Sequence, residues 1–204
     1  MCRASHGYGA PMGRQRRPEV AGGYYHVTAR GNSGAAICGD DDDFALLFGL
    51  LAHAVARFDW QCFAYCLLSN HYHLVLRITA ATLSRGMRWL NGLYAHRHNE
   101  RHGRKGHLFG GRYRTGVIES DRHLAEACRY VDLNPVRAGL CNHPGEWRWS
   151  SYGASVGEVS RPSILSLDVV RAFGGADGYA EYVEEGLAAI RAERHARKRV
   201  RPEV

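Results

Sequence analysis

The sequence predicts an α+β fold of the ferredoxin-like kind, a sandwich with its elements in the order β-α-β-β-α-β-α. Three observations predict it. Four short stretches are rich in aromatic and β-branched residues, which is typical of strands. Longer stretches with apolar residues at helical spacing separate them. Ser69-Asn70 lies between the second and third strands and supplies turn residues for an antiparallel hairpin. We therefore expect one antiparallel sheet with helices on one face and the other face open for function.

The first strand is predicted over residues 23–30, GYYHVTAR, and the first helix follows in DDDDFALLFGLLAHAVARF. This helix begins in a run of four acids, Asp40 to Asp43. The helix dipole favours negative charge at a helix N-terminus. We therefore interpret the acidic run as the start of the helix, in preference to a metal site.

Two further strands are predicted over residues 60–68 and 72–78, on either side of the Ser-Asn turn. A second helix covers residues 81–101. A glycine-rich loop, GRKGHLFGGR, then leads to a fourth strand over residues 113–119.

The third helix begins after Ser120 or Asp121, either of which can cap it, and runs to about Leu133. Asn134-Pro135 disturbs or ends this helix, because a residue before proline avoids the α region.

The chain is predicted to divide into three parts: a flexible basic arm (1–20), a main domain (21–140) and an extension (141–204). The extension starts with irregular chain packed by aromatic residues, over about residues 141–166. A last helix, near residues 167–197, leads into a basic tail.

The net charge of +7 is concentrated in segments. Residues 1–20 hold four Arg against one Glu, and residues 191–204 hold six basic residues against two acids. Residues 77–114 hold nine basic residues against Glu100 alone. Of the 27 basic residues, 25 are Arg, whose forked guanidinium matches phosphate and favours nucleic acid as a partner. A GC-rich genome would also raise the Arg content, but it does not explain the clustering.

The composition argues against a membrane protein, a secreted protein and a zinc-ribbon protein. No apolar run reaches the roughly 18–20 residues that a membrane span needs, and the N-terminus has no apolar signal segment. A cytoplasmic protein is the expectation. The cysteines include no CxxC pair, so we expect reduced, mostly buried thiols; they are Cys2, Cys38, Cys62, Cys66, Cys128 and Cys141.

The triplet His71-Tyr72-His73 lies on the third predicted strand. Side chains alternate across a strand, so both histidines share one face while Tyr72 and Leu74 point to the core. Two imidazoles side by side are a start for a divalent-metal site, which suits phosphodiester cleavage. Taken alone, the triplet is better explained as a pair of solvated histidines, and it needs partners to indicate a site.

Several motifs supply those partners, in a fixed order along the chain. The runs are YYHVTARGN, AYCLLSNHYHLVLRI, GHLFGGRYRTGVIESDRHLAEACRYVDLNPVRAGL and EWRWSSY. From Tyr24 to Tyr152 the chain resembles the REP-associated tyrosine transposases. These belong to the HUH endonuclease superfamily, together with the single-tyrosine insertion-sequence transposases. Because several motifs keep their order and spacing, the resemblance is far more specific than any one of them.

The resemblance implies an HUH transposase catalytic domain over residues 21–140. It implies that His71 and His73 bind Mg²⁺ or Mn²⁺, with Asn134 completing the metal shell. Tyr130 would attack a phosphate of single-stranded DNA, leaving a 5′-phosphotyrosine and a free 3′-OH. The implied substrate is a hairpin from repeated extragenic palindromes, and a monomer is favoured over a dimer.

The chain departs from the family pattern at two places. Ser69 stands where the family usually has proline before the histidine pair, which changes the turn more than the chemistry. Gly110-Gly111 stands where Gln-Gly is common, so a contact to a base or a phosphate is expected to be missing there.

The position of Tyr130 on its helix supports the assigned role independently. Leu124, Cys128 and Val131 form the apolar stripe of the third helix, and Tyr130 falls roughly 120° from its centre. Asn134 falls near Tyr130 if the helix persists beyond Leu133. A tyrosine on a polar flank is less easily explained by packing than one on a strand.

The basic excess of residues 77–114 predicts a wall that binds DNA phosphates, although a solvated helix face explains part of it. Trp89, Phe109 and Tyr113 are candidates for stacking on bases. The residues predicted to contact DNA are Arg30, Arg77, Arg85, Arg88, Arg104, Lys105, Arg112, Arg114 and Arg137.

Two alternative functions stay open from the sequence. A replication-initiator or relaxase-type nickase would share the chemistry but usually forms part of a longer chain. A non-catalytic module for single-stranded nucleic acid would share the sheet and its exposed face, but no convincing pair of stacking aromatics marks it.

Overall fold

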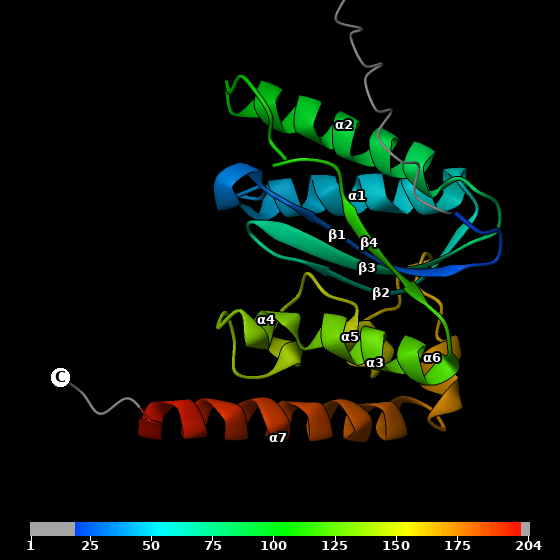
Figure 1. The fold of residues 1–204 in the computed structure, drawn as a ribbon, viewed down its shortest axis with the longest axis vertical. Helices are drawn as coiled ribbons and strands as arrows, with labels where there is room; N and C mark the ends of the chain where they lie inside the picture. Colours follow the sequence, from blue (N-terminus) through cyan, green and yellow to red (C-terminus); the bar gives the residue numbers. More distant parts are fainter. Residues whose placement is uncertain (1–18, 201–204) are drawn as a thin grey trace, which may run out of the picture.

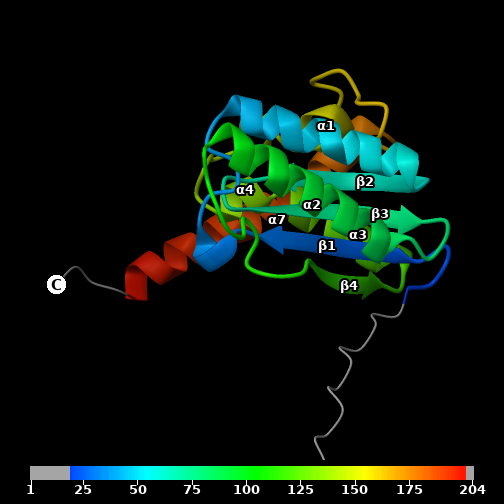
Figure 2. The ribbon, with the colours of Figure 1, turned by 90° about the horizontal axis from the view of Figure 1, so that it is seen from above.

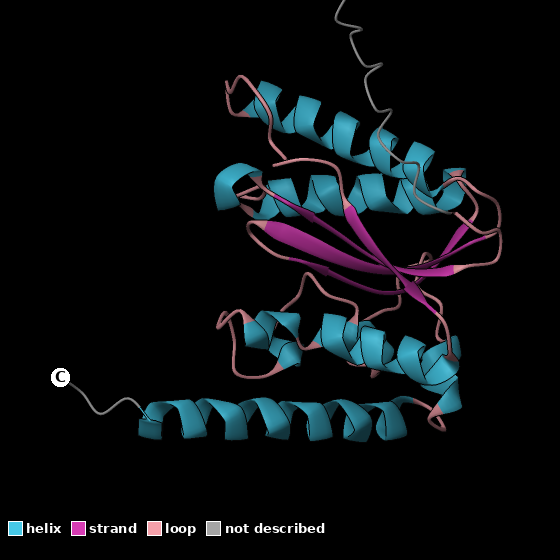
Figure 3. Cartoon of the chain, viewed as in Figure 1, coloured by secondary structure: helices cyan, strands magenta, loops and turns pink. Residues whose placement is uncertain are grey.

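The structure, a computed structural model, describes residues 19–200 and the side chains of residues 19–196. The predicted basic arm falls almost wholly outside this part, as does the end of the basic tail. The β-α-β-β-α-β-α order is confirmed (Figure 1 and Figure 3). The principal elements are β1 (Tyr24–Arg30), α1 (Asp41–Arg57), β2 (Trp60–Leu67), β3 (His71–Ile78), α2 (Leu83–Arg101), β4 (Arg114–Ile118) and α3 (Asp121–Asp132).

The four strands form one antiparallel sheet in the order β2-β3-β1-β4. The predicted hairpin through Ser69-Asn70 joins β2 to β3. Long crossings carry the chain from β1 to β2 and from β3 to β4, so β1 lies beside β3 at the centre. In that pairing Thr28 lies opposite His73 and Arg30 lies opposite His71. The sheet order therefore brings the first strand directly beside the histidine triplet.

Helices cover both faces of the sheet, which corrects the expectation of a fully open face. The helices α1 and α2 lie on one side, and α3 lies on the other, against β2 and β3 (Figure 1). Figure 2, seen from above, shows α1 and α2 lying over the sheet, roughly along the direction of its strands. The helix α3 packs on the sheet because its apolar stripe must be buried against an apolar surface. Val75 of β3 and Phe63 of β2 provide that surface. Only the part of that face over β1, β4 and the start of β3 is left for a cleft.

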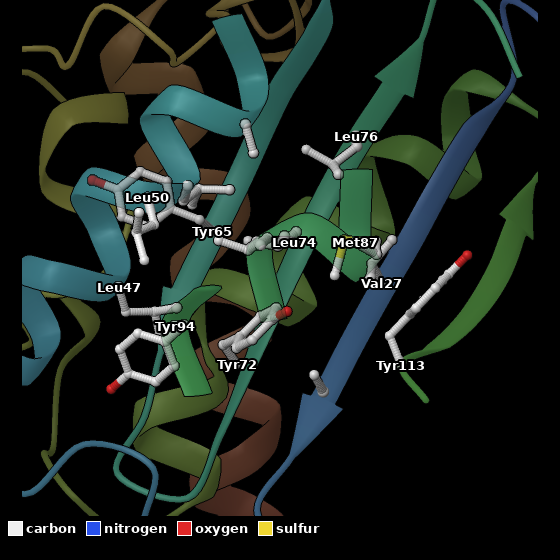
Figure 4. Close-up of a cluster of buried hydrophobic side chains, with 14 of the residues drawn as sticks. Val27, Leu47, Leu50, Tyr65, Tyr72, Leu74, Leu76, Met87, Tyr94 and Tyr113 are labelled. Atoms are coloured by element: carbon white, nitrogen blue, oxygen red, sulfur yellow. The ribbon is translucent and has the colours of Figure 1, made fainter. Parts of the chain in front are cut away.

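The core between the sheet and the α1–α2 layer takes one set of alternating strand residues. Tyr72, Leu74 and Leu76 of β3 point into it, as the alternation predicted, and Val27 of β1 lies beside them (Figure 4). At roughly 25 cal/mol per Å² of buried apolar surface, this core is the main source of stability. His71 and His73 consequently lie on the opposite face.

The predicted N-terminal capping residues of α1 and α3 are confirmed. Asp40 lies before α1 and its Oδ1 accepts a hydrogen bond from the backbone N–H of Asp43, at 3.0 Å. Ser120 caps α3 by accepting from the backbone N–H of His123, at 3.2 Å. The interpretation of the acidic run as a helix start thus holds for Asp40, whereas Asp43 is turned inward and is fully buried.

The chain after α3 is more helical than predicted. The turn at Asn134-Pro135 does end α3, and the short helix α4 (Asn134–Arg137) follows at once. In place of one last helix there are two, α6 (Asp168–Ala172) and α7 (Ala176–Val200), separated at Gly174-Gly175. Both glycines have positive φ, which no helix continues through. Before them lie two single turns, a 3-10 turn over Pro144–Glu146 and α5 (Tyr152–Ser155).

The extension packs on α3 through a second apolar core and one buried carboxylate. Val183 and Leu187 of α7 contact this core. Asp132, at the end of α3, is fully buried and accepts hydrogen bonds from the hydroxyls of Ser151 and Tyr179, at 2.8 and 2.6 Å. These two bonds join α3 to the chain just before α5 and to the start of α7, and so fix the helix that carries Tyr130.

The packing of α2 on β2 gives a test of the fold. A Cβ at Gly86 would lie 2.2 Å from Cζ2 of Trp60, whose indole N–H is held by Thr82 Oγ1 at 2.9 Å. We expect Gly86→Ala to lower the free energy of unfolding by about 2–3 kcal/mol, as overpacked cores do. Gly92→Ala on the same helix meets nothing within 4 Å and should raise it by about 0.5–1 kcal/mol. Urea denaturation of both variants checks this, and equal effects would contradict the described packing.

The predictions for thiols hold in the described part of the chain. Cys38, Cys62, Cys66 and Cys128 are buried and free, Cys141 is partly buried and free, and Cys2 lies outside the described residues. Within residues 19–200, none of the helices has the length and apolar character to cross a membrane.

Candidate active site

A cleft of about 890 Å³ opens on the sheet face that carries the histidine pair. Its floor comes from β1, β3 and β4, and its side from the flank of α3. The lining residues are His26, Thr28, Arg30, Gly31, His71, His73, Gly110, Gly111, Arg112, Arg114, Thr115, Gly116 and Tyr130.

His71 and His73 lie side by side, with ring centroids 5.0 Å apart. The Nδ1 atom of His71 is 2.6 Å from Oδ1 of Asn70, and the Nδ1 atom of His73 is 2.9 Å from Nε2 of His26. Each Nδ1 is thus occupied by a neighbour, which leaves Nε2 of each ring available as a ligand. This arrangement, in which one nitrogen is held and the other is free, is common to metal-binding histidines.

His26 is part of this site and was not predicted from the sequence. Its ring stacks on His73 with centroids 5.1 Å apart. The signal was present in the first strand, where the alternation of YYHVTAR places His26, Thr28 and Arg30 on one face. This alternation places His26 beside the histidine pair only if β1 pairs with β3, which the sequence does not show.

Burial keeps the three histidines neutral. Burial, together with the neighbouring His26 and His71, lowers the pKa of His73 to about 3. Burial likewise lowers the pKa of His26 and of His71. A neutral imidazole has a free lone pair and can bind a cation without first releasing a proton.

Tyr130 faces this cluster from α3. Its ring lies edge-on to both His26 and His73, with centroids 5.6 Å away in each case. The side chain is 41% exposed, which is unusual for a large aromatic residue in this chain and puts the ring at the mouth of the cleft. The guanidinium of Arg137 lies over the same ring, 5.6 Å from its centroid. The phenol of Tyr130 therefore lies beside paired imidazoles and an arginine at the surface and not in the core.

Asn134 reaches the site from the start of α4. Its side chain is 5% exposed and hydrogen-bonds to His71, where it opposes the effect of burial by raising the pKa of that imidazole. The break at Leu133 does not remove Asn134 from the flank of Tyr130, because α4 continues directly from α3. The structure therefore brings His71, His73, Tyr130 and Asn134 together.

The family described as "Transposase IS200 like" matches residues 19–134, which is more than half of the chain. The chain belongs to the IS200-like transposase family. It is therefore an enzyme of the tyrosine HUH nuclease class, whose members cleave and rejoin DNA.

One solved structure agrees on the fold. A REP-associated tyrosine transposase bound to a REP hairpin is 17% identical, with a TM-score of 0.61 over 78% of this chain and 93% of that one. A tRNA(His) guanylyltransferase from Saccharomyces cerevisiae is 12% identical, with a TM-score of 0.45 over 85% of this chain and 74% of that one. A search of curated proteins finds no match.

The arginines predicted to bind DNA are spread over several surfaces of the transposase. Arg30, Arg112 and Arg114 line the cleft. Arg88 lies instead in a second hollow of about 660 Å³, between α2 and the glycine-rich loop.

The other basic residues lie away from the floor of the cleft. Arg77 donates to Gln61 Oε1 at 3.0 Å, and Arg85 lies over the ring of Phe58. Arg104 and Lys105 are exposed in the glycine-rich loop.

Arg101, which lies within the basic stretch of residues 77–114, does not belong to the predicted phosphate-binding wall. It forms ion pairs with Asp40, Asp42 and Asp43, with N–O distances of 2.7, 3.0 and 2.7 Å. Its charge is therefore already matched by the acidic run. The sequence reasoning treated the basic stretch as one surface, but helical periodicity turns part of it toward α1.

The predicted stacking residues also take other roles. Phe109 packs beside Tyr72 and Tyr94, with ring centroids 6.3 Å away in each case, and Trp89 lies against Phe58. The rings of Tyr113 and Phe109 border the second hollow and not the cleft.

Proposed function

We propose that this transposase cleaves and rejoins single-stranded DNA with Tyr130 as the nucleophile. The observation that carries the proposal is the placement of an exposed tyrosine ring edge-on to two paired, neutral histidines. Residues 21–140 form the proposed catalytic domain and residues 141–204 the proposed extension, whose described part packs on α3.

The proposed cofactor is Mg²⁺ or Mn²⁺, bound by Nε2 of His71, Nε2 of His73 and the amide oxygen of Asn134. The donor set fits such an ion, because both Nδ1 atoms are already held and the Asn134 side chain adjoins His71. When bound, the cation would draw charge from the non-bridging phosphate oxygens.

The protein's own groups supply the rest of the proposed step. The Tyr130 oxygen forms a bond to phosphorus while the bond from phosphorus to the 3′ oxygen breaks. The phenol proton is lost to solvent and the 3′ oxygen takes up a proton, so the products are a 5′-phosphotyrosine and a 3′-OH. The guanidinium of Arg137 lies over the ring and places a positive charge beside the reacting group. Because a phenolate is also a good leaving group, a 3′-OH can reverse the step, which gives rejoining.

The proposed substrate is single-stranded DNA that carries a hairpin. The similar fold bound to a REP hairpin supports this choice, as do Arg30, Arg112 and Arg114 along the cleft. We propose that a monomer acts, because the extension packs on its own α3 through Asp132.

The test is an adduct assay. Purified protein is mixed with Mn²⁺ and a 3′-labelled single strand that contains a hairpin and its 5′ flank. We expect labelled DNA to stay on the protein through denaturing electrophoresis. Cleavage without any adduct would point instead to a water nucleophile. Tight binding of RNA with no cleavage of DNA would support a non-catalytic binding module.

The arginines in the cleft give a graded prediction for DNA affinity. We expect Arg112→Ala/Arg114→Ala to weaken binding about equally for all sequences and to reduce the slope of log affinity against log salt by about 2. Arg97→Ala is the matched control, because Arg97 is exposed on α2 and lines neither the cleft nor the second hollow. Fluorescence anisotropy between low and moderate salt measures both. An equal effect of Arg97→Ala would move the binding surface to α2.

A further inference from the structure

A second group of potential metal ligands lies on the other side of the sheet, between α1 and α2. Asp43 comes from the start of α1, and His98 and His102 lie one turn apart near the end of α2. Each offers one ligand atom, and these atoms all lie within 4.8 Å of one another. The active-site histidines lie on β3, so the two groups are separate.

The distances in this group match those between the ligands of a tetrahedral ion. Two ligands bound at about 2.0–2.1 Å to such an ion lie roughly 3.3 Å apart. Oδ2 of Asp43 is 2.9 Å from Nε2 of His102 and 3.7 Å from Nε2 of His98. Nε2 of His102 is also 3.0 Å from Oδ1, so a single N–H would have to be shared between two acceptors.

The state of His98 is an independent observation that points to a ligand. Its side chain is 4% exposed, and its Nδ1 is buried without a hydrogen-bond partner in the described part of the chain. Its Nε2, at 3.7 Å, is beyond hydrogen-bond distance of the Asp43 carboxylate. The imidazole is thus buried, with its Nε2 near the carboxylate but too far from it to form a hydrogen bond. A cation on Nε2 would give this imidazole the strong interaction that the ion-pair network does not provide.

The charges around the group also favour a divalent cation. Three carboxylates, Asp40, Asp42 and Asp43, meet the single guanidinium of Arg101, which leaves two negative charges in excess. The Asp43 carboxylate is fully buried and is oriented by the backbone N–H of Gly39, at 2.8 Å.

We propose that Asp43, His98 and His102, with a water molecule in the fourth position, bind a Zn²⁺ ion that ties the start of α1 to the end of α2. Two histidines and a carboxylate are a common zinc ligand set, and two histidines four residues apart on a helix present both rings to one ion. Arg101 holds the carboxylate from outside the ligand set.

The test uses full-length, metal-stripped protein in which His71→Ala/His73→Ala has removed the active-site donors. Co²⁺ serves as the probe, because its d–d absorption is strong only in a tetrahedral site. We expect about one equivalent to bind with tetrahedral bands that Zn²⁺ abolishes, and Zn²⁺ to raise the melting temperature.

Three variants in this background decide the assignment. His102→Ala, at a side chain that is 31% exposed, and His98→Ala/His102→Ala should each abolish the tetrahedral bands and the shift in melting temperature. His96→Ala/His107→Ala is the control, because both histidines are exposed, and it should keep them. The single exposed substitution keeps the test valid where the double variant unfolds. Absence of tetrahedral Co²⁺ in the parent, or its persistence after His102→Ala, would overturn the proposal and leave an ion-pair clamp.

Discussion

Tyr130→Phe is expected to abolish the covalent adduct with single-stranded DNA while leaving DNA binding within about twofold of the unsubstituted protein. The substitution removes one oxygen atom from a residue that is 41% exposed and whose hydroxyl forms no hydrogen bond within residues 19–200. The ring contacts with His26 and His73 stay, because they involve only the edge of the ring. The loss therefore falls on the reacting atom alone.

The expected size of the effect is large because the oxygen is the nucleophile in the proposed step. Without it no bond to phosphorus can form from this side chain, so the adduct should fall below detection. Residual cleavage by water, if the metal site persists, should be slower by a factor of at least about 1,000, which corresponds to about 4 kcal/mol of lost transition-state stabilisation.

The matched control is Tyr182→Phe on α7. Tyr182 is also partly exposed on a helix and also lies under an arginine, since the guanidinium of Arg129 is 4.0 Å from its ring centroid. It lies outside the cleft, so this variant should form the adduct at the normal rate. An adduct that persists in Tyr130→Phe and disappears in another tyrosine variant would move the nucleophile to that residue.

The sequence predicted the fold well where local pattern decides the structure. The alternation in HYHLVLRI separates the core side of β3 from its histidine side, and the apolar stripe of α3 places Tyr130 on a flank. Both are local properties, so they survive without knowledge of what packs where. The break at Asn134-Pro135 was also predictable, because the steric restriction before proline is local.

Properties that depend on packing between distant segments could not be predicted. The sequence shows that α3 is amphipathic, but not that its apolar side covers β2 and β3 and so closes half of the sheet face. His26 could not be assigned, because its role depends on the pairing of β1 with β3. Arg101 was counted with the phosphate-binding residues for the same reason: its partners lie about 60 residues earlier in the chain. The predicted division into domains at residue 140 stays a prediction.

The second large effect is expected from the histidine pair. His71→Ala and His73→Ala should each lower metal-dependent cleavage by at least about 1,000-fold, because a bound cation stabilises the charge on the phosphate by several kcal/mol. EDTA should lower cleavage by the unsubstituted protein to a similar extent. Added Mn²⁺ should restore cleavage by the EDTA-treated protein but not by the two variants. Cleavage assays against Mn²⁺ concentration, with circular dichroism to check folding, measure this. Full activity in either variant would rule out the proposed metal site.

A variant of His26 separates the ligands of the proposed ion from their supporting residues, because His26 contacts His73 and is not itself a proposed ligand. Its Nε2 holds Nδ1 of His73 and so fixes which nitrogen faces the cleft. Loss of such an outer partner typically weakens metal affinity by about 10–100-fold. We therefore expect His26→Ala to shift the Mn²⁺ titration by this factor and to reach nearly normal cleavage at saturating Mn²⁺, whereas His73→Ala stays inactive at every concentration. Calorimetric titration of Mn²⁺ into each variant gives a readout that does not depend on cleavage. If both variants behaved alike, His26 would itself be a ligand, and the site would hold its ion with three histidines.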